Sequence, residues 1–133
     1  MKIIFDTNVL ISAFISHGHC AELFEHCIRN HELAVSEFII GEFQDKLLTV
    51  FNMPAGQVTA AVSLLRSRLE VVEPVRFDTP ACRDADDDAI LGTAVRVHAV
   101  CIVTGDKDLL DMKKFREVDI ILPAAFWKYE EGR

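Results

Sequence analysis

The chain has 133 residues and a mass of 14.9 kDa, which suffices for one hydrophobic core and hardly for two, so we expect a single domain over residues 1–133. Half of the residues are hydrophobic and 26% are charged, which excludes an intrinsically disordered chain. No apolar run approaches the roughly 20 residues of a membrane span, and no signal-peptide pattern opens the chain, so a cytoplasmic protein without membrane contact is expected. The net charge of −7 is opposite to the basic character typical of nucleic-acid binders, and a carboxylate cluster that binds divalent cations would explain part of it.

The first third of the chain predicts a strand followed by two helices. Residues 2–5 form a β-branched and aromatic run that predicts a strand ending at Asp6. The apolar spacing of residues 9–14 predicts a helix directly after it. Residues 17–19 (His-Gly-His) interrupt the pattern, and residues 23–31 resume it as a second helix.

The middle of the chain repeats this alternation. Residues 33–35 predict a second strand, and Ser36 is the expected N-cap of a helix that continues to residue 48. Pro54 ends that stretch and opens a further helix to residue 69, since proline is favoured in the first turn of a helix. Residues 71–72 are strand-like.

The last third begins with the acidic run Asp84 to Asp88, which opens a helix with an apolar face over residues 90–97. Residues 100–103 are apolar on both faces, as in a central parallel strand. The remaining predicted elements are a short helix at 109–115, a strand at 118–122 and a terminal helix at 123–129. Strands alternating with helices predict an α/β fold, with a mostly parallel central sheet covered on both faces.

The cysteines and histidines show no metal-binding spacing. The four cysteines form no C-x-x-C pair, and we expect reduced thiols packed as small hydrophobic groups rather than a disulfide or zinc site. The histidines are expected at the surface or in loops. The residues concerned are Cys20, Cys27, Cys82 and Cys101, and His17, His19, His26, His31 and His98.

Four carboxylates are predicted to converge. Asp6 and Asp106 each follow a predicted apolar strand, and ligands of parallel sheets bind beyond the carboxyl ends of the strands. Asp87 lies in the first turn of its helix, on the face that is expected to contact the sheet. Glu42 lies in a helix among apolar residues, a setting too apolar for a glutamate with only water as its partner.

Such carboxylates would repel one another and could not all stay ionised without a cation. Oxygen-only ligands select a hard ion, Mg²⁺ or Mn²⁺, completed by water and a substrate phosphate. An ion of this kind activates water for attack on a phosphodiester. The sequence therefore predicts a metal-dependent phosphodiester hydrolase that needs no covalent intermediate.

The motifs in this order resemble the PIN-domain family. They are Phe5 to Leu10, Ser36 with Glu42 six residues later, Asp84 to Asp88 leading to Ala94, and Thr104 to Leu110, so the resemblance spans nearly the whole chain. It is most similar to the subgroup of toxins from bacterial toxin–antitoxin pairs. The first and last motifs are specific together, whereas the Ser36 to Glu42 stretch alone is weak.

The resemblance implies a three-layer α/β/α fold and Mg²⁺- or Mn²⁺-dependent cleavage of single-stranded RNA. It also implies a homodimer and, for a toxin, a basic antitoxin partner. Its metal-site acids correspond to Asp6, Glu42, Asp87 and Asp106. The hydrogen-bonding supports are Asn8, Thr104 and Ser36, with Asp84 and Asp108 as further candidates.

The acid of the third motif is open among three neighbours. The family pattern has one acid before a non-acidic residue, whereas this chain reads Asp86-Asp87-Asp88. Asp87 is chosen because it lies seven residues before Ala94, as the family's acid does before its small helical residue. Asp86 and Asp88 stay as alternatives.

Three other functions compete. An aspartate-nucleophile phosphatase would need a second acid two residues after Asp6, where Asn8 stands. A non-catalytic RNA- or protein-binding module is disfavoured because all four acids are present. A nuclease of RNA processing rather than a toxin stays open, since fold analogy does not fix a biological role.

Overall fold

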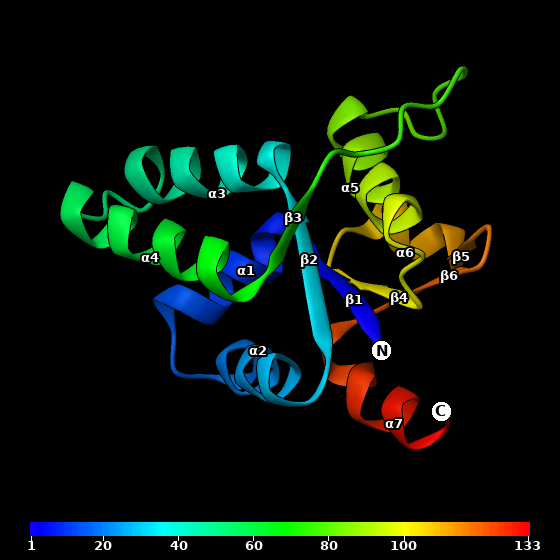
Figure 1. Ribbon diagram of the computed structural model, residues 1–133, viewed down its shortest axis with the longest axis horizontal. Coiled ribbons are helices and arrows are strands. Elements are labelled where there is room, and N and C mark those ends of the chain that lie inside the picture. Colours follow the sequence, from blue (N-terminus) through cyan, green and yellow to red (C-terminus); the bar gives the residue numbers. More distant parts are fainter.

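The computed structural model describes residues 1–133 and contains the predicted alternation of strands and helices (Figure 1). The strands are β1 (Lys2–Phe5), β2 (Glu32–Ser36), β3 (Glu70–Val72), β4 (Cys101–Val103), β5 (Lys114–Phe115) and β6 (Val118–Ile121). The helices are α1 (Thr7–Ile15), α2 (His19–Asn30), α3 (Glu37–Thr49), α4 (Ala55–Arg68), α5 (Ala85–Arg96), α6 (Lys107–Met112) and α7 (Phe126–Glu131), with the 3₁₀ turn η1 (Pro123–Ala125) before α7.

The strands form one six-stranded sheet in the order β3-β2-β1-β4-β6-β5. All neighbours are parallel except β5 and β6. The two central strands are paired so that Phe5 lies opposite Val103. Both strands run in the same direction, so the residues that follow them emerge at the same edge of the sheet. The prediction of a mostly parallel central sheet is confirmed.

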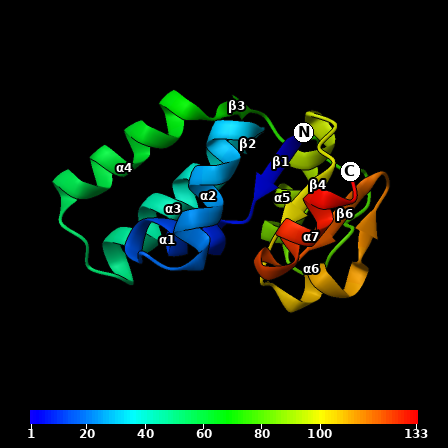
Figure 2. The ribbon, with the colours of Figure 1, turned by 90° about the horizontal axis from the view of Figure 1, so that it is seen from below.

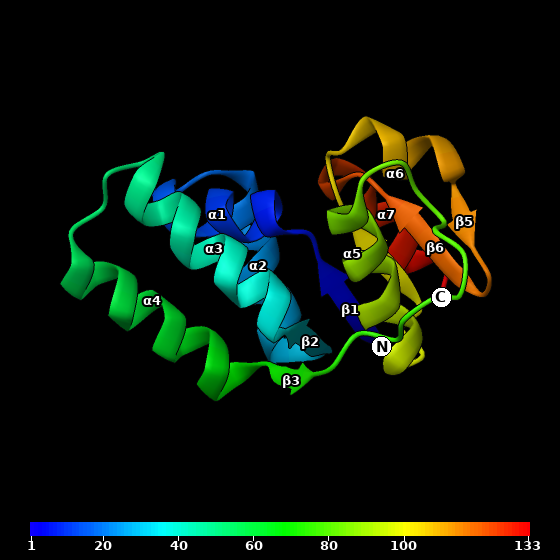
Figure 3. The same ribbon diagram turned by 90° about the horizontal axis from the view of Figure 1, so that it is seen from above.

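Helices cover both faces of the sheet, as the three-layer prediction requires. In Figure 1, α3 and α5 lie above the sheet, whereas α2 and α7 lie below it. The view from below shows α2 and α7 in front (Figure 2), and the view from above shows α3 and α5 on either side of β1 (Figure 3). The 32 buried hydrophobic residues form one connected cluster, so both layers share a core. None of the helices combines the length and the apolar character that crossing a bilayer demands.

The helix boundaries follow the expected capping residues. Ser36 caps α3, with its hydroxyl oxygen accepting a hydrogen bond from the Ile39 N–H at 3.3 Å. Asp84 and Asp106 cap α5 and α6 by accepting from the N–H groups two residues later. Three of the acids and hydroxyls singled out in the sequence therefore also define where helices begin.

One element differs from the prediction. The helix expected over residues 109–115 ends at Met112, and Lys114 and Phe115 form β5 instead. Lys113 adopts a left-handed φ of 61°, which ends the helix. Arg116, with φ 53°, lies in the two-residue turn that pairs β5 with β6. Such turns are usually marked by Gly or Asn, so the sequence carried no signal for this hairpin.

Gly92 allows a close backbone approach on α5. The segment between β3 and α5 runs beside this helix (Figure 3), and the Val75 N–H donates to the Gly92 carbonyl at 3.0 Å. A Cβ atom at Gly92 would lie 2.3 Å from the Val75 carbonyl oxygen, whereas one at Gly41 of α3 would meet nothing within 4 Å.

We therefore predict opposite effects of the same substitution on two helices. Gly92→Ala should lower the free energy of unfolding by about 1–3 kcal/mol, because the backbone of residue 75 must move. Gly41→Ala should raise it by up to about 1 kcal/mol through helix propensity. Urea denaturation of the two variants measures both changes in the free energy of unfolding. Equal changes would show that the backbone of residue 75 can move away from α5 without destabilising the protein.

Candidate metal centre

Asp6 and Asp106 are brought together by the central strands. The Asp6 N–H donates to the carbonyl of Val103 at 3.0 Å, which extends the β1–β4 pairing by one residue. Thr104 then links the two acids. Its hydroxyl donates to Asp6 Oδ2 at 2.6 Å, and its oxygen accepts from the Asp106 N–H at 2.9 Å. Thr104 is fully buried, so this linkage is held inside the protein.

Glu42 reaches the same edge from α3. The hydroxyl of Thr7, in the first turn of α1, donates to Glu42 Oε1 at 2.9 Å. One turn further along α3, Lys46 Nζ donates to the side-chain oxygen of Asn8 at 3.2 Å. The start of α1 and the middle of α3 are thus joined by two side-chain hydrogen bonds.

The three consecutive aspartates have different environments. The side-chain oxygens of Asp87 lie among those of Asp106 and Asp108, with ligand atoms within 4.8 Å of one another. Asp86 faces Glu42 closely enough to affect its pKa. Asp88 points away from the pocket, because its carboxylate accepts hydrogen bonds from the N–H groups of Ala81 and Cys82. The structure therefore orients Asp87 and Asp86 inward and uses Asp88 to fix the preceding loop.

Together these groups line a pocket of about 350 Å³ at the carboxyl edge of the sheet. Its walls hold six carboxylates and a single ammonium group, that of Lys46. The lining residues are Asp6, Thr7, Asn8, Glu42, Lys46, Asp84, Asp86, Asp87, Ile90, Gly105 and Asp106. The four acids predicted to converge are all present, although a hundred positions separate the first from the last.

Burial, and after it the neighbouring carboxylates, raises the pKa values of three of these acids. Burial, followed by the nearby carboxylate of Asp106, raises the pKa of Asp87 to about 7. Burial likewise raises the pKa of Asp6, although the hydrogen bond from Thr104 partly opposes it. The pKa of Glu42 is also raised, first by burial and then by Asp86, against the hydrogen bond from Thr7. Each acid would gain from a nearby cation.

Three of the five predicted supporting residues, Ser36, Thr104 and Asp108, do not line the pocket. Ser36 is fully buried under the start of α3, where it acts as the N-cap. Asp108 lies at the rim and pairs with Arg83 at 3.1 Å. Asn8 and Asp84 line the pocket, and Thr104 reaches it through its hydrogen bond to Asp6.

Sequence reasoning missed Thr7 and Lys46. Lys46 carried a signal, because it follows Glu42 by four residues and therefore lies on the same helix face. Thr7 lies between Asp6 and Asn8 in the first motif, and only the packing of α1 against α3 reveals its partner.

The lining suits a hard divalent cation. It offers carboxylate and amide oxygens and no imidazole or thiolate, the donor set typical of Mg²⁺ or Mn²⁺ sites. The side chains of Asp6, Asp87 and Asp106 converge from β1, α5 and the end of β4. Burial raises the pKa values of Asp6 and Asp87, and a cation held between these carboxylates would favour their ionised forms.

Comparisons with known proteins give a family match, a relative in sequence and similar folds. The family model described as PIN domain matches residues 2–108. The uncharacterized protein MJ1680 of Methanocaldococcus jannaschii is 31% identical over 121 residues, covering 85% of this chain and 76% of that protein. The fold is similar to VapBC-1 from nontypeable Haemophilus influenzae, at 18% identity over 93% of this chain and 99% of that chain with a TM-score of 0.65. It is also similar to the PIN domain endonuclease Utp24, at 20% identity over 90% of this chain and 82% of that chain with a TM-score of 0.52.

The raised pKa of Asp87 predicts how stability depends on pH without metal. Between pH ~4 and ~7 the folded state binds more protons at Asp87 than the unfolded state, so the free energy of unfolding falls as pH rises through this window. Asp87→Asn removes the carboxyl whose ionisation lowers the free energy of unfolding, so the variant should be more stable than the parent at pH 8. The expected gain is only about 1 kcal/mol, because water screens this partly exposed carboxyl.

The measurement is urea denaturation in EDTA from pH 5 to pH 8. The gap between variant and parent should shrink as pH falls. Asp111→Asn, which alters an exposed carboxyl outside the pocket, should keep the pH profile of the parent. Identical profiles for Asp87→Asn and the parent would show that the pocket does not destabilise the folded state.

Proposed function

Because the chain belongs to the PIN domain family, we propose that it is a divalent-metal-dependent endoribonuclease that cleaves single-stranded RNA. The observation that carries this proposal is the pocket where Asp6, Glu42, Asp87 and Asp106 converge beside a single ammonium group. The pKa values of three of these acids, Asp6, Glu42 and Asp87, are raised, first of all by burial. A structural role alone would not gather like charges in this way. The endonuclease named among the structural neighbours supports cleavage within a chain.

The metal would be held by Asp6, Asp87 and Asp106, with Glu42 completing the set. When bound, Mg²⁺ or Mn²⁺ lowers the pKa of water and neutralises charge on the phosphoryl oxygens. Thr104 orients Asp6 through its 2.6 Å hydrogen bond, so this carboxylate needs no rearrangement on binding. No side chain of the pocket is required as a nucleophile.

Glu42 and Lys46 supply the remaining functions in this proposal. Glu42 is oriented by Thr7, and its raised pKa suits it to accept a proton from the attacking water. Lys46 is the group that can approach a substrate phosphate, because all other ionisable groups of the lining are acids. A phosphodiester entering the pocket therefore meets a cation at α3 and the metal ligands opposite.

For the biological role, we propose the toxin of a toxin–antitoxin pair. The structural neighbours include a VapBC toxin–antitoxin complex, and an acidic chain with net charge −7 suits a basic antitoxin. Co-expression decides between this role and RNA processing, because a toxin should arrest growth and be neutralised by the product of a neighbouring gene.

The proposal predicts that Asp106→Asn abolishes cleavage without unfolding the protein. Asparagine still caps α6, but an amide is a poorer ligand for a hard cation, so the cleavage rate should fall by more than about a hundredfold. Added Mn²⁺ should raise the melting temperature of the parent more than that of the variant.

The assay uses single-stranded RNA, hairpin RNA and single-stranded DNA with Mg²⁺, Mn²⁺ or EDTA. Asp111→Asn, on the same helix but outside the pocket, is the matched control and should cut like the parent. Cleavage in EDTA would overturn the metal-dependent mechanism, and a fully active Asp106→Asn would remove this residue from the site.

We further propose that the protein forms a homodimer. Large apolar side chains are exposed at the end of α3, where Val50 is 62% and Phe51 is 45% exposed. Exposed apolar groups of this size favour association. Sedimentation velocity should show a dimer at micromolar concentration, and a monomer at every concentration would contradict the homodimer.

A further inference from the structure

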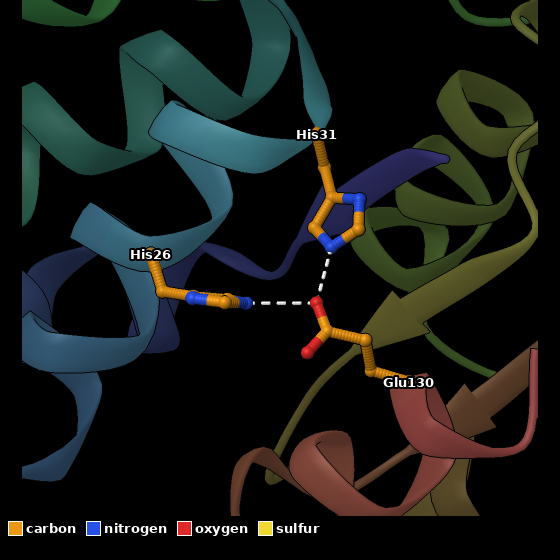
Figure 4. A group of neighbouring side chains, drawn as sticks. All are labelled: His26, His31 and Glu130. Carbon is orange, nitrogen blue, oxygen red and sulfur yellow. Dashed lines mark hydrogen bonds and ion pairs between the residues drawn. The ribbon is translucent and has the colours of Figure 1, made fainter.

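A second cluster of ligating side chains lies away from the acidic pocket. His26 on α2, His31 directly after α2 and Glu130 on α7 point toward one another from three positions of the chain (Figure 4). Glu130 Oε2 lies 2.7 Å from His26 Nε2 and 2.5 Å from His31 Nε2. The side chains of the two histidines are 28% and 11% exposed, so the cluster is partly shielded from water.

The surroundings of the cluster orient both imidazole rings. His26 Nδ1 lies 3.3 Å from the Asn30 side-chain nitrogen, and His31 Nδ1 lies 3.4 Å from the nitrogen of Met1. Both Nε2 atoms therefore face the same carboxylate oxygen. No lysine or arginine pairs with Glu130, which leaves two imidazoles as its partners. The rings of Phe126 and Trp127, at the start of α7, pack against the His26 imidazole and help to hold it in place.

We propose that His26, His31 and Glu130 form a binding site for a transition-metal ion of the Zn²⁺ type. Two imidazole nitrogens and one carboxylate oxygen are a donor set that zinc accepts, with water in the fourth position. Bonds of roughly 2.0–2.2 Å in tetrahedral geometry place ligand atoms about 3.3 Å apart. The three atoms already lie within 4.8 Å of one another. The Glu130 oxygen, now 2.7 Å and 2.5 Å from the two Nε2 atoms, would move away from them to admit the ion.

Binding requires a change of tautomer at both rings. Each neutral imidazole must carry its proton on Nδ1, since Nε2 becomes the ligand. Rotation of the Asn30 amide would turn its oxygen toward His26 Nδ1 as an acceptor. At His31 the Met1 ammonium must release a proton to solvent before its nitrogen can accept from Nδ1–H. The three ligand atoms are therefore present, and the groups beside the two Nδ1 atoms, the Asn30 amide and the Met1 nitrogen, can become hydrogen-bond acceptors.

The two sites differ in chemistry and in place. The acidic pocket lies at the carboxyl ends of β1 and β4, whereas His31 precedes β2 and lies at the opposite edge of the parallel strands. Four residues of strand separate the two edges by about 13 Å. The pocket offers oxygen alone, while the second site offers nitrogen, so Mg²⁺ occupies the first without competing for the second.

An ion at this second site would join α2 to α7. Helix α7 is also anchored by the buried ring of Phe126 and by the Tyr129 hydroxyl, which donates to Asp119 at 2.7 Å. Metal binding would therefore reinforce an existing contact rather than create the fold. The expected consequence is a higher melting temperature and no change in the acidic pocket.

The test is titration of the metal-free protein with Co²⁺, a visible-light probe of tetrahedral zinc sites, in excess Mg²⁺. We expect one Co²⁺ per chain with a tetrahedral spectrum that Zn²⁺ displaces, and a rise in melting temperature with Zn²⁺. Glu130→Gln, His26→Gln and His31→Gln should each weaken Co²⁺ binding by at least about tenfold. Three single variants are used so that the result does not depend on the folding of any one.

Controls are Glu131→Gln, next to Glu130 but outside the cluster, and His98→Gln, an exposed histidine elsewhere. Both should bind Co²⁺ like the parent. Absence of Co²⁺ binding in the parent, or binding retained in all three folded cluster variants, would overturn the proposal. So would an octahedral spectrum lost in Asp106→Asn, which would assign the ion to the acidic pocket.

Discussion

The parallel pairing of β1 with β4 is the constraint from which the acidic pocket follows. With Phe5 opposite Val103, the next residue of each strand must emerge at the same edge, so Asp6 and Thr104 become neighbours across 98 positions of sequence. A shift of one residue would turn Asp6 to the other face of the sheet and break the hydrogen bond. The buried cores of the strands thus fix the position of a polar group that lies beyond them.

Gathering carboxylates at this edge opposes folding, and several features of the fold limit the cost. Helices α1 and α5 begin beside the pocket, and the partial positive charge at a helix N-terminus stabilises nearby anions. Thr104 and Thr7 donate hydrogen bonds to Asp6 and Glu42. Lys46 contributes the one ammonium group. Their sum is insufficient to return Asp87 to its ordinary pKa, so a cation beside this carboxylate would relieve part of the remaining cost.

Sequence patterns predicted the pocket because its residues follow strand ends and helix starts. Asp6 and Asp106 were located by the strand pattern, and Asp87 by the helix periodicity around Ile90 and Ala94. The sequence does not distinguish the environments of Asp86, Asp87 and Asp88. An aspartate in the first turn of a helix can cap the helix, hydrogen-bond to the preceding loop or point into a pocket, and all three roles suit the same residue type. The loop hydrogen bonds of Asp88 exist only because residues 81 and 82 turn back toward α5.

The cluster of His26, His31 and Glu130 was hidden for a different reason. His26 and His31 were expected at the surface or in loops, because neither has zinc-like spacing with a cysteine, and the third member lies about a hundred residues away. The spacing of residues along the chain does not reveal a site whose members come from distant segments without a common pattern. Asp6 and Asp106 could be predicted to converge because each follows a strand, and the carboxyl ends of parallel strands lie at the same edge of a sheet.

The position of Glu130 also bears on what the family match explains. That match covers residues 2–108, so α7 and β6 lie beyond it, yet α7 packs onto α2 within it. Phe126 is fully buried and the ring of His26 contacts Trp127, so the last helix completes the lower layer of the sandwich. The acidic pocket at one edge of the sheet depends on the central pair of strands, and α7 contacts the start of one of them, because the Tyr129 hydroxyl donates to the carbonyl of Val100 at 3.3 Å. An ion that strengthened the α2–α7 contact would therefore stabilise the fold without contributing a ligand to the pocket.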